Sequence, residues 1–192
     1  MGYIQPLFRL FGPLLKLQPF ILKNYCCKFC KFEKTERSRF PVPISINDLD
    51  HLSFNSLQEY FNWYFSLMIQ MHCEICLQNH LESEIKYEND PNFIIIELVS
   101  LNGRLNPNFN YDKILTSKNS NYQLISTLNM PYPDHFTCCI YEPIFDSQEN
   151  ENQWFVHDDL IGNLVPLAKY SQLKEHNPII FFYRKFNSKN IV

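Results

Sequence analysis

The stretch PDHFTCCIYEPIFDSQENENQWFVHDDL, residues 133–160, joins two β-rich runs through a polar loop. A histidine, His135, stands at the head of the first run, and two carboxylates, Asp158 and Asp159, follow the aromatic second run. The segment DSQENENQ predicts a loop tip between two antiparallel strands. Because such a hairpin brings its outer ends together, we expect His135 to lie beside the acidic pair.

These residue types favour proton transfer. The imidazole of His135 can take a proton from a thiol or a hydroxyl, and a carboxylate behind it fixes the tautomer and stabilises the imidazolium. The alternative is a structural histidine at the start of a strand, the more common role of a lone histidine. The spacing alone leaves both interpretations open.

Outward from this stretch, similar runs predict one antiparallel sheet: NFIIIELVSL (92–101), YQLISTL (122–128) and PIIFFYR (178–184). Upstream, residues 53–71 place apolar side chains at spacings of three and four, and Ser56 with Glu59 has the form of a capping box. This pattern predicts a helix with one face in the core. The first half of the chain thus holds the helix and the paired cysteines, and the second half holds the strands. This arrangement predicts an α+β fold.

Two Cys-x-x-Cys pairs predict a structural zinc site with four thiolate ligands, because each pair can form a tight turn that aims both sulfurs at one ion. The residues are Cys27, Cys30, Cys73 and Cys76. The alternative is a set of reduced, partly buried thiols without a metal. His72 and His80 flank the second pair, and we interpret them as bystanders because four sulfurs already fill a tetrahedron. Seven cysteines, an odd number, favour a reducing compartment over a disulfide framework.

Length and charge limit the function further. A chain of 192 residues with a net charge of −3 fits one domain and lacks the basic excess that tracks a phosphate backbone. Three prolines and three basic residues break the apolar N-terminal segment before any run reaches membrane-spanning length, and we predict a short helical or irregular element to about residue 25. We therefore expect no nucleic-acid or membrane partner, and no organic cofactor.

The motifs occur in the order Cys-x-x-Cys, SLQEYF, Cys-x-x-Cys, PNFIIIEL, YQLISTLN, DHFTCCIY, QWFVHDDL and PIIFFYR. This series resembles the latter two thirds of a ubiquitin-specific protease domain, a papain-like cysteine peptidase built of fingers, palm and thumb. The similarity covers about residues 5 to 185. It implies one partial domain over residues 1–192: fingers with knuckles and one helix at about 20–90, a palm sheet with the histidine motif at about 91–186, and no thumb.

The resemblance also implies roles for individual residues. His135 matches the general base, Asp158 the acid that orients it, and Asp159 a neighbouring acidic position that supports the oxyanion region. The four paired cysteines match the zinc ligands of the fingers. Asp134 replaces the usual glycine and Phe136 the usual tyrosine, and FIIIELVSL lacks the basic ending of its strand. These departures indicate a divergent member, and some divergent relatives act on SUMO or on no modifier at all.

The nucleophile is the missing part. In the family it lies in an Asn-x-Cys box on a helix well before the first knuckle, and the nearest match here is Cys26, two places after Asn24. Cys26 directly precedes Cys27, which leaves no room for the helix and loops between box and knuckle. Cys138 and Cys139 lie on one predicted strand, where we expect packing roles. We therefore predict that this chain lacks the attacking thiol.

Three functions follow. The first is an intracellular enzyme, cytoplasmic or nuclear, that hydrolyses the isopeptide bond after the C-terminal glycine of ubiquitin or a ubiquitin-like protein. The second is an inactive pseudo-peptidase that binds the modifier or a partner protein without cleaving it. The third is a zinc-knuckle domain that contacts nucleic acid, against which the acidic balance argues. The sequence does not decide whether the chain is active, nor its oligomeric state.

Overall fold

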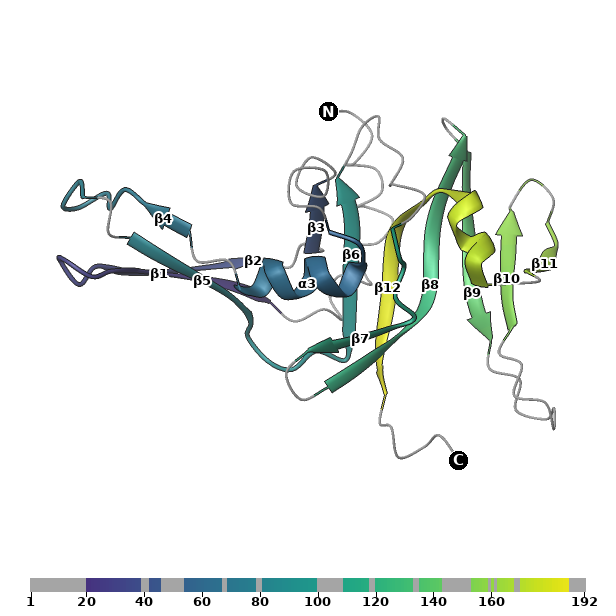
Figure 1. Cartoon of the computed structure of the whole chain (residues 1–192), viewed down its shortest axis with the longest axis horizontal. Coiled ribbons are helices and arrows are strands. Elements are labelled where there is room, and N and C mark those ends of the chain that lie inside the picture. Colours follow the sequence, from purple (N-terminus) through teal and green to yellow (C-terminus); the bar gives the residue numbers. More distant parts are fainter. Residues whose placement is uncertain are drawn as a thin grey trace. The chain divides into compact units, whose positions relative to one another are not determined.

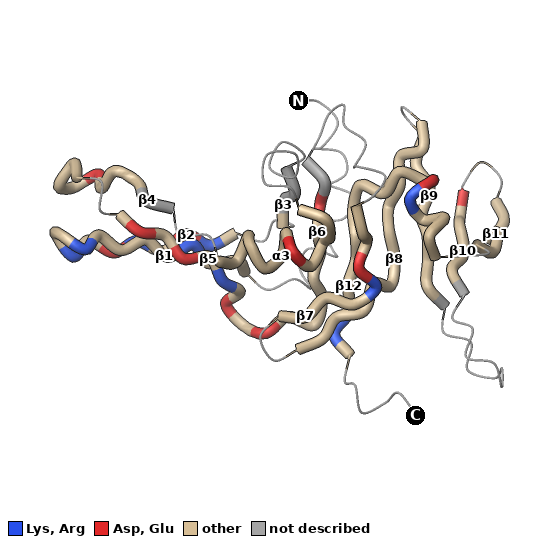
Figure 2. Tube along the Cα trace, viewed as in Figure 1, with Lys and Arg blue, Asp and Glu red and all other residues tan. Residues whose placement is uncertain are grey.

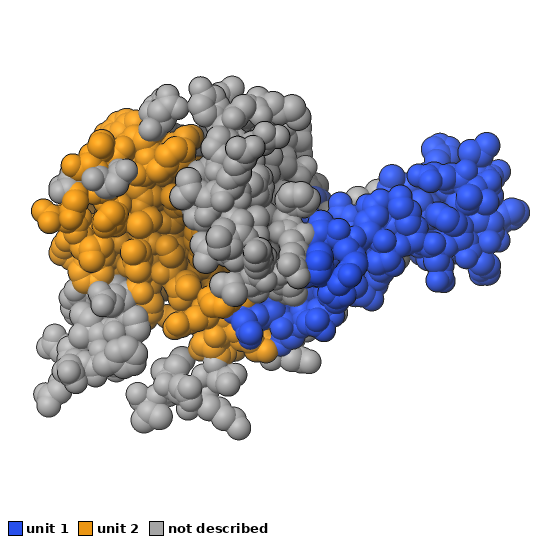
Figure 3. Space-filling view, turned by 180° about the vertical axis from the view of Figure 1, so that it is seen from behind, with its two compact units in different colours: residues 1–41, 58–92 blue, residues 42–57, 93–192 orange. Residues whose placement is uncertain are grey.

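The structure is a computed structural model of the chain. It describes residues 20–38, 42–45, 54–66, 69–78, 81–99, 109–117, 120–132, 135–142, 153–158, 160, 162–167 and 170–186. The chain divides into two compact units, coloured separately in Figure 3. Unit 1 comprises residues 1–41 and 58–92, and unit 2 comprises residues 42–57 and 93–192.

Unit 1 holds a four-stranded sheet in the order β2-β1-β5-β4, with every neighbouring pair antiparallel (Figure 1). The strands are β1 (Ile21–Cys27), β2 (Glu33–Ser38), β4 (Ile69–Met71) and β5 (Leu81–Tyr87). The prediction of a helical or irregular element to about residue 25 is wrong for Ile21 to Tyr25, because strands pair with this segment on both sides. Residues 1–19 of that prediction lie outside the described residues.

The predicted helix is present and shorter than its apolar pattern. Helix α3 runs from Leu57 to Ser66, and Ser56 directly precedes it. Its buried face carries Tyr60, Phe61 and Tyr64, at the predicted spacings of three and four. The last part of the pattern, Ile69–Met71, is strand β4 instead, because its backbone pairs with β5.

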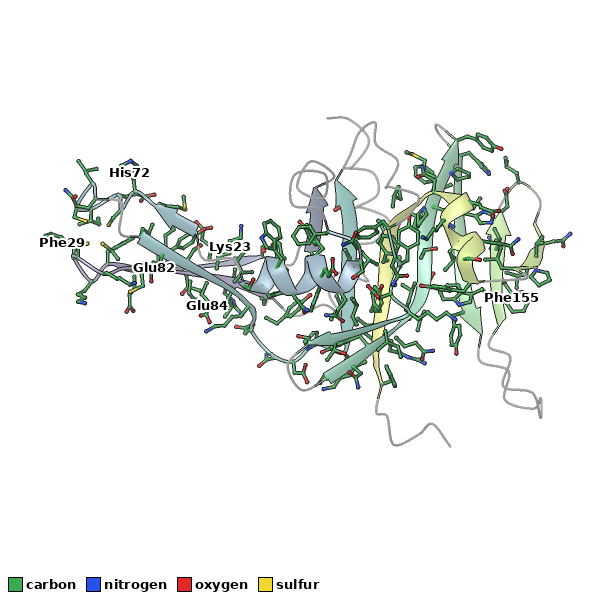
Figure 4. The ribbon with its side chains drawn as sticks, in the orientation of Figure 1. Lys23, Phe29, His72, Glu82, Glu84 and Phe155 are labelled. Atoms are coloured by element: carbon green, nitrogen blue, oxygen red, sulfur yellow. The ribbon has the colours of Figure 1, made fainter. Side chains whose placement is uncertain are left out.

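Charged side chains of both signs are mixed along the strands of unit 1 (Figure 2). Ion pairs join Lys28 to Glu82, Lys34 to Glu36, Lys86 to Glu84 and Arg37 to Glu88. Figure 4 labels Lys23 on β1 and Glu82 and Glu84 on β5. No strand of this sheet therefore carries a basic stripe among the described residues.

Unit 2 holds an eight-stranded sheet in which β11-β10-β9-β8-β12-β6-β3 follow in order and β7 pairs with β8. The bounds are β3 (Val42–Ser45), β6 (Phe93–Val99), β7 (Ile114–Ser117), β8 (Ser120–Tyr132), β9 (His135–Glu142), β10 (Gln153–Asp158), β11 (Leu164–Leu167) and β12 (Pro178–Phe186). All pairs are antiparallel except β3 with β6. The five runs predicted as strands, β6, β8, β9, β10 and β12, are confirmed.

The core of unit 2 forms around β12, which lies between β8 and β6. Phe181 and Tyr183 are fully buried, and a 3-10 helix, η1 (Tyr170–His176), adds the buried Leu173. The hydroxyl of Tyr183 donates to the carbonyl of Asp112 at 2.7 Å, and that of Tyr170 donates to the carbonyl of Tyr111 at 2.5 Å. These bonds hold the segment before β7 against the core.

Among the described residues, no helix combines the length and the apolar character that a membrane crossing requires.

Candidate functional site

The hairpin of β9 and β10 brings His135 and Asp158 together, as their spacing predicts. Asp158 is the last residue of β10 and pairs with Thr137, two residues after His135 on β9. Nε2 of His135 lies 3.0 Å from Oδ2 of Asp158, and each side chain is 20% exposed. The two groups thus form a hydrogen-bonded dyad that solvent, and hence a reacting group, can still reach.

The carboxylate fixes the tautomer of the ring. An ionised carboxylate only accepts hydrogen bonds, so Nε2 of His135 carries the proton and Nδ1 keeps the lone pair. Two hydrogen bonds fix Asp158, one to its side chain and one to its backbone. Oδ1 accepts a bond from the backbone N–H of Leu160 at 3.0 Å, and the backbone carbonyl accepts a bond from the N–H of Gly162 at 2.9 Å. Gly162 has a φ of +71°, a conformation that glycine adopts without strain. Asp159, predicted to support the oxyanion region, lies outside the described residues.

The two thiols on β9 are poor nucleophiles. Cys139 is fully buried and accepts a hydrogen bond from Nδ2 of Asn129 at 3.2 Å, while Cys138 is partly buried. Burial raises the pKa of both thiols, so both stay protonated near neutral pH. This arrangement fits the packing roles predicted for them.

Cys26, the weak candidate for the nucleophile, is an exposed residue of β1 in unit 1, whereas the dyad belongs to unit 2. Its neighbours across the sheet are Glu33 on β2 and Glu82 on β5. Both cross-strand neighbours of Cys26 are thus acidic residues, whereas nucleophilic cysteines typically lie among cations or at a helix N-terminus.

The four paired cysteines form a second cluster, in unit 1. The Sγ atoms of Cys27, Cys30, Cys73 and Cys76 all lie within 4.8 Å of one another. The pairs Cys27 with Cys76 and Cys30 with Cys73 are each 3.6 Å apart. Four sulfurs at about 2.3 Å from a tetrahedral zinc ion are roughly 3.8 Å apart, so this cluster has the dimensions of such a site.

The two turns that carry these cysteines share one backbone geometry. The N–H of Cys27 donates to the carbonyl of Phe32 at 2.8 Å, and that of Lys31 donates to the carbonyl of Cys27 at 3.0 Å. Cys73 makes the same two bonds: its N–H donates to the carbonyl of Gln78 at 2.9 Å, and its carbonyl accepts a bond from the N–H of Leu77 at 2.8 Å. Lys31 and Leu77 have φ angles of 60° and 56°. The sequence does not reveal this conformation, because neither position is a glycine.

Backbone amides point at the sulfurs within these turns. Hydrogen bonds from the N–H of Cys30, and then of Phe29, lower the pKa of the Cys27 thiol to about 6 even though burial opposes this. At Cys30 the backbone N–H of Phe32 also lowers the pKa, but burial and the neighbouring thiols outweigh it and raise the pKa to about 12. A thiol must lose its proton to bind a metal ion, so the lowered pKa of Cys27 favours metal binding there. Figure 4 labels Phe29, directly before Cys30, and His72, directly before Cys73. His72 is exposed and is not a member of the metal-ligating cluster within the described chain, whereas His80 lies outside it.

No family model matches the sequence, and no curated protein matches it either. Solved structures do match. A chain of the yeast SAGA DUB module has a TM-score of 0.64 at 16% identity, over 89% of this chain and 41% of that one. The fold is ubiquitin-specific-protease-like. At this level of identity the likeness concerns the fold alone, and it confirms the predicted resemblance in its coarse form.

Two further matches have the same ubiquitin-specific-protease-like fold. The SAGA DUB module of Ubp8, Sgf11, Sus1 and Sgf73 bound to monoubiquitin gives a TM-score of 0.60 at 14% identity, over 89% of this chain and 41% of its own. The Pan2 pseudoubiquitin hydrolase-RNA exonuclease module of Saccharomyces cerevisiae gives 0.59 at 16% identity, over 88% and 33%. The chain thus spans less than half the length of the structures it matches.

Proposed function

We propose that this chain forms the fingers and palm of a divergent ubiquitin-specific-protease-like domain that binds ubiquitin or a ubiquitin-like protein such as SUMO. In the proposed reaction, hydrolysis of the isopeptide bond after the C-terminal glycine of the modifier, His135 is the general base and Asp158 orients it. The observation that carries the proposal is the 3.0 Å contact of these two side chains, within a fold of this type.

In the proposed mechanism, each nitrogen of the His135 ring has one role. Nδ1 of His135 takes the proton of a cysteine thiol, and the thiolate attacks the carbonyl carbon of the glycine. His135 then gives the proton to the departing lysine amine, which leaves an acyl thioester. Water, activated by the same nitrogen, releases the free carboxylate and regenerates the thiol. Asp158 keeps Nε2 protonated throughout and stabilises the imidazolium. From the resemblance, Asp159 would support the oxyanion.

The attacking thiol separates two versions of the proposal. The thiols of Cys138, partly buried, and Cys139, buried, both have raised pKa values, which favours a pseudo-peptidase that holds the modifier without cleaving it. The alternative is an enzyme whose nucleophile is Cys26 or a thiol outside this sequence. A role in nucleic-acid binding is disfavoured by the mixed charges of unit 1. Seven unpaired thiols fit a reducing compartment, the cytoplasm or the nucleus.

We also propose that Cys27, Cys30, Cys73 and Cys76 hold a structural zinc ion. Four sulfurs fill all positions of a tetrahedral ion and leave none for a substrate, so the metal would supply a cross-link between two turns and no reaction step. No organic cofactor is needed for the proposed chemistry.

The test uses ubiquitin and, separately, SUMO carrying a thiol-reactive group at the C-terminus. After incubation with each probe, the intact mass of the folded chain is measured. An adduct at one cysteine that disappears in His135→Ala supports the enzyme. Binding of unmodified ubiquitin or SUMO without any adduct supports the pseudo-peptidase. A folded chain that neither binds nor reacts with either protein contradicts both versions.

A further inference from the structure

Strand β8 contains a bulge immediately beside the dyad. Asn129 pairs with Thr137 of β9, and the next paired residues are Tyr132 and His135, so β8 advances three residues while β9 advances two. Pro131 lies in this interval and has no N–H to donate to a ladder. Bulges increase the local twist and re-aim the side chains beside them. The bulge therefore helps to set the direction from which His135 approaches its partner.

One residue, Asn177, binds both backbone groups of Met130 within the bulge. The N–H of Met130 donates to the carbonyl of Asn177 at 3.0 Å, and Nδ2 of Asn177 donates to the carbonyl of Met130 at 2.8 Å. Asn177 lies between η1 and β12 and has a φ of +51°. Asparagine is among the few residue types that adopt this conformation readily, and it also supplies the donor. Both properties are needed at this position.

On the other side of the bulge, a buried polar cluster fixes the register of β8 and β9. Asn129 is fully buried; its Oδ1 accepts the hydroxyl of Thr127 at 2.7 Å, and its Nδ2 donates to Oγ1 of Thr137 at 3.3 Å. Thr137 in turn pairs with Asp158 on β10. The acid is thus placed through a locked register, while the position of His135 depends on the shape of the bulge.

We propose that Asn177 is a positioning residue. Its two hydrogen bonds to the backbone of Met130 fix the shape of the bulge. The bulge in turn holds the ring of His135 so that Nε2 contacts Asp158 and Nδ1 faces the reacting group. The effect on the ring is inferred from the pairing of Tyr132 with His135 directly after the bulge, whereas its value for a reaction or for binding of a modifier rests on the proposed function.

The test is ¹⁵N NMR of the histidine rings in the free, full-length chain. Asn177→Gly keeps the positive φ and the carbonyl but removes the donor to Met130. We expect its His135 ring to become a mixture of the two neutral tautomers. We also expect the Nε2 proton to exchange with water about tenfold faster, because its hydrogen bond to the charged Asp158 becomes weaker. Asn177→Asp tolerates the same φ but places an oxygen against the Met130 carbonyl. We expect it to change the His135 ring in the same way, and it replaces the glycine variant if that variant does not fold.

The matched control is Asn121→Ala. Asn121 lies on β8, the strand that contains the bulge, but far from the bulge, and its side-chain amide accepts the hydroxyl of Thr116. The His135 ring of this variant should match the wild type. A folded Asn177→Gly or Asn177→Asp chain with an unchanged tautomer and unchanged Nε2 exchange overturns the proposal. This readout needs no modifier, so it is independent of the proposed function: if the ring responds but ubiquitin and SUMO never bind, only the proposed function fails.

Discussion

At the scale of single residues, Leu77 adopts a backbone conformation that costs energy. Its φ is 56° and the residue is 74% exposed, so the strain is not offset by burial. A left-handed conformation costs an L-residue roughly 1–2 kcal/mol. Glycine avoids this strain, but its more flexible unfolded state costs about 0.5–1 kcal/mol of folding stability.

We predict that Leu77→Gly raises the free energy of unfolding by about 0.5–1 kcal/mol. Leu77→Ala keeps the Cβ atom and hence the strain, so it should not be stabilising. Denaturant unfolding of the metal-loaded protein measures both variants. Equal free energies for the glycine and alanine variants would show that φ at this position does not limit stability.

The sequence predicts some residues of the site and not others, for a physical reason. His135 and Asp158 were predictable because a polar loop between two apolar runs specifies a hairpin, and a hairpin specifies proximity. Asn177 was not, because its partner Met130 lies 47 residues earlier and no periodic pattern relates the two. The positive φ of Leu77 was hidden for another reason: its residue type gives no sign of it.

At the scale of elements, two turns depend on one cluster of sulfurs. The β1–β2 turn supplies Cys27 and Cys30, and the segment between β4 and β5 supplies Cys73 and Cys76. Leu81 is buried with Cys27 and Cys73 in a small core there, and the residues packed against it are Tyr25, Cys30, Phe32 and Cys76. A core of this size offers little apolar area for holding two turns together. A bound ion would therefore contribute much of the local stability.

We predict one zinc ion per chain by elemental analysis, and its loss in Cys27→Ser. Adjacent Cys26→Ser is the matched control and should keep the ion, because Cys26 lies outside the cluster. A chelator should speed hydrogen exchange in residues 27–32 and 73–78 and leave β8 and β12 unchanged. Full zinc binding by Cys27→Ser, or exchange that ignores the chelator, would contradict a structural metal site.

The elements were predicted unevenly, again for identifiable reasons. Runs such as PIIFFYR combine β-branched and aromatic residues between turn residues, and they are strands as predicted. Strand β1 was missed because its sequence, ILKNYCC, has little alternation of its own and is fixed by pairing with two neighbours. The helix was predicted too long because an apolar period does not show where sheet pairing begins.

At the scale of the whole molecule, two buried tyrosines and a third that is partly buried make unit 2 sensitive to alkaline pH. Burial raises the pKa of Tyr111, Tyr170 and Tyr183 above the usual value near 10. In the unfolded chain these groups lose their protons near pH 10, while in the folded chain they keep them. Their contribution to stability is thus complete below pH 10 and is lost as the pH rises above it.

We predict that the free energy of unfolding falls above pH 10 by up to about 1.4 kcal/mol per pH unit for each of these tyrosines. Denaturant midpoints between pH 8 and 11 measure the slope, and tyrosinate absorbance reports ionisation. Tyr183→Phe should make the fall in the free energy of unfolding with pH less steep, by the contribution of one tyrosine. Tyrosinate absorbance from all three groups in a chain of undiminished stability would refute the assignment.

The order of strands in the sheet could not be predicted from periodicity. The last strand, β12, lies in the middle between β8 and β6, and β3 joins β6 in parallel. A period-two pattern indicates which side chains share a face, but not which strands are neighbours. The ordered series of motifs predicted a ubiquitin-specific-protease-like fold through its resemblance to that family, but it did not predict the order of the strands.

The most direct test of the central claim is a titration of the ¹⁵N-labelled, folded chain with ubiquitin and with SUMO, observing the ring of His135. Each modifier is compared with a version that lacks its two C-terminal glycines. If the dyad receives the C-terminal tail, at least one full-length modifier should shift the ring resonances of His135, and its truncated version should not. Ring resonances that remain unchanged with both full-length modifiers at saturating concentration would contradict the claim.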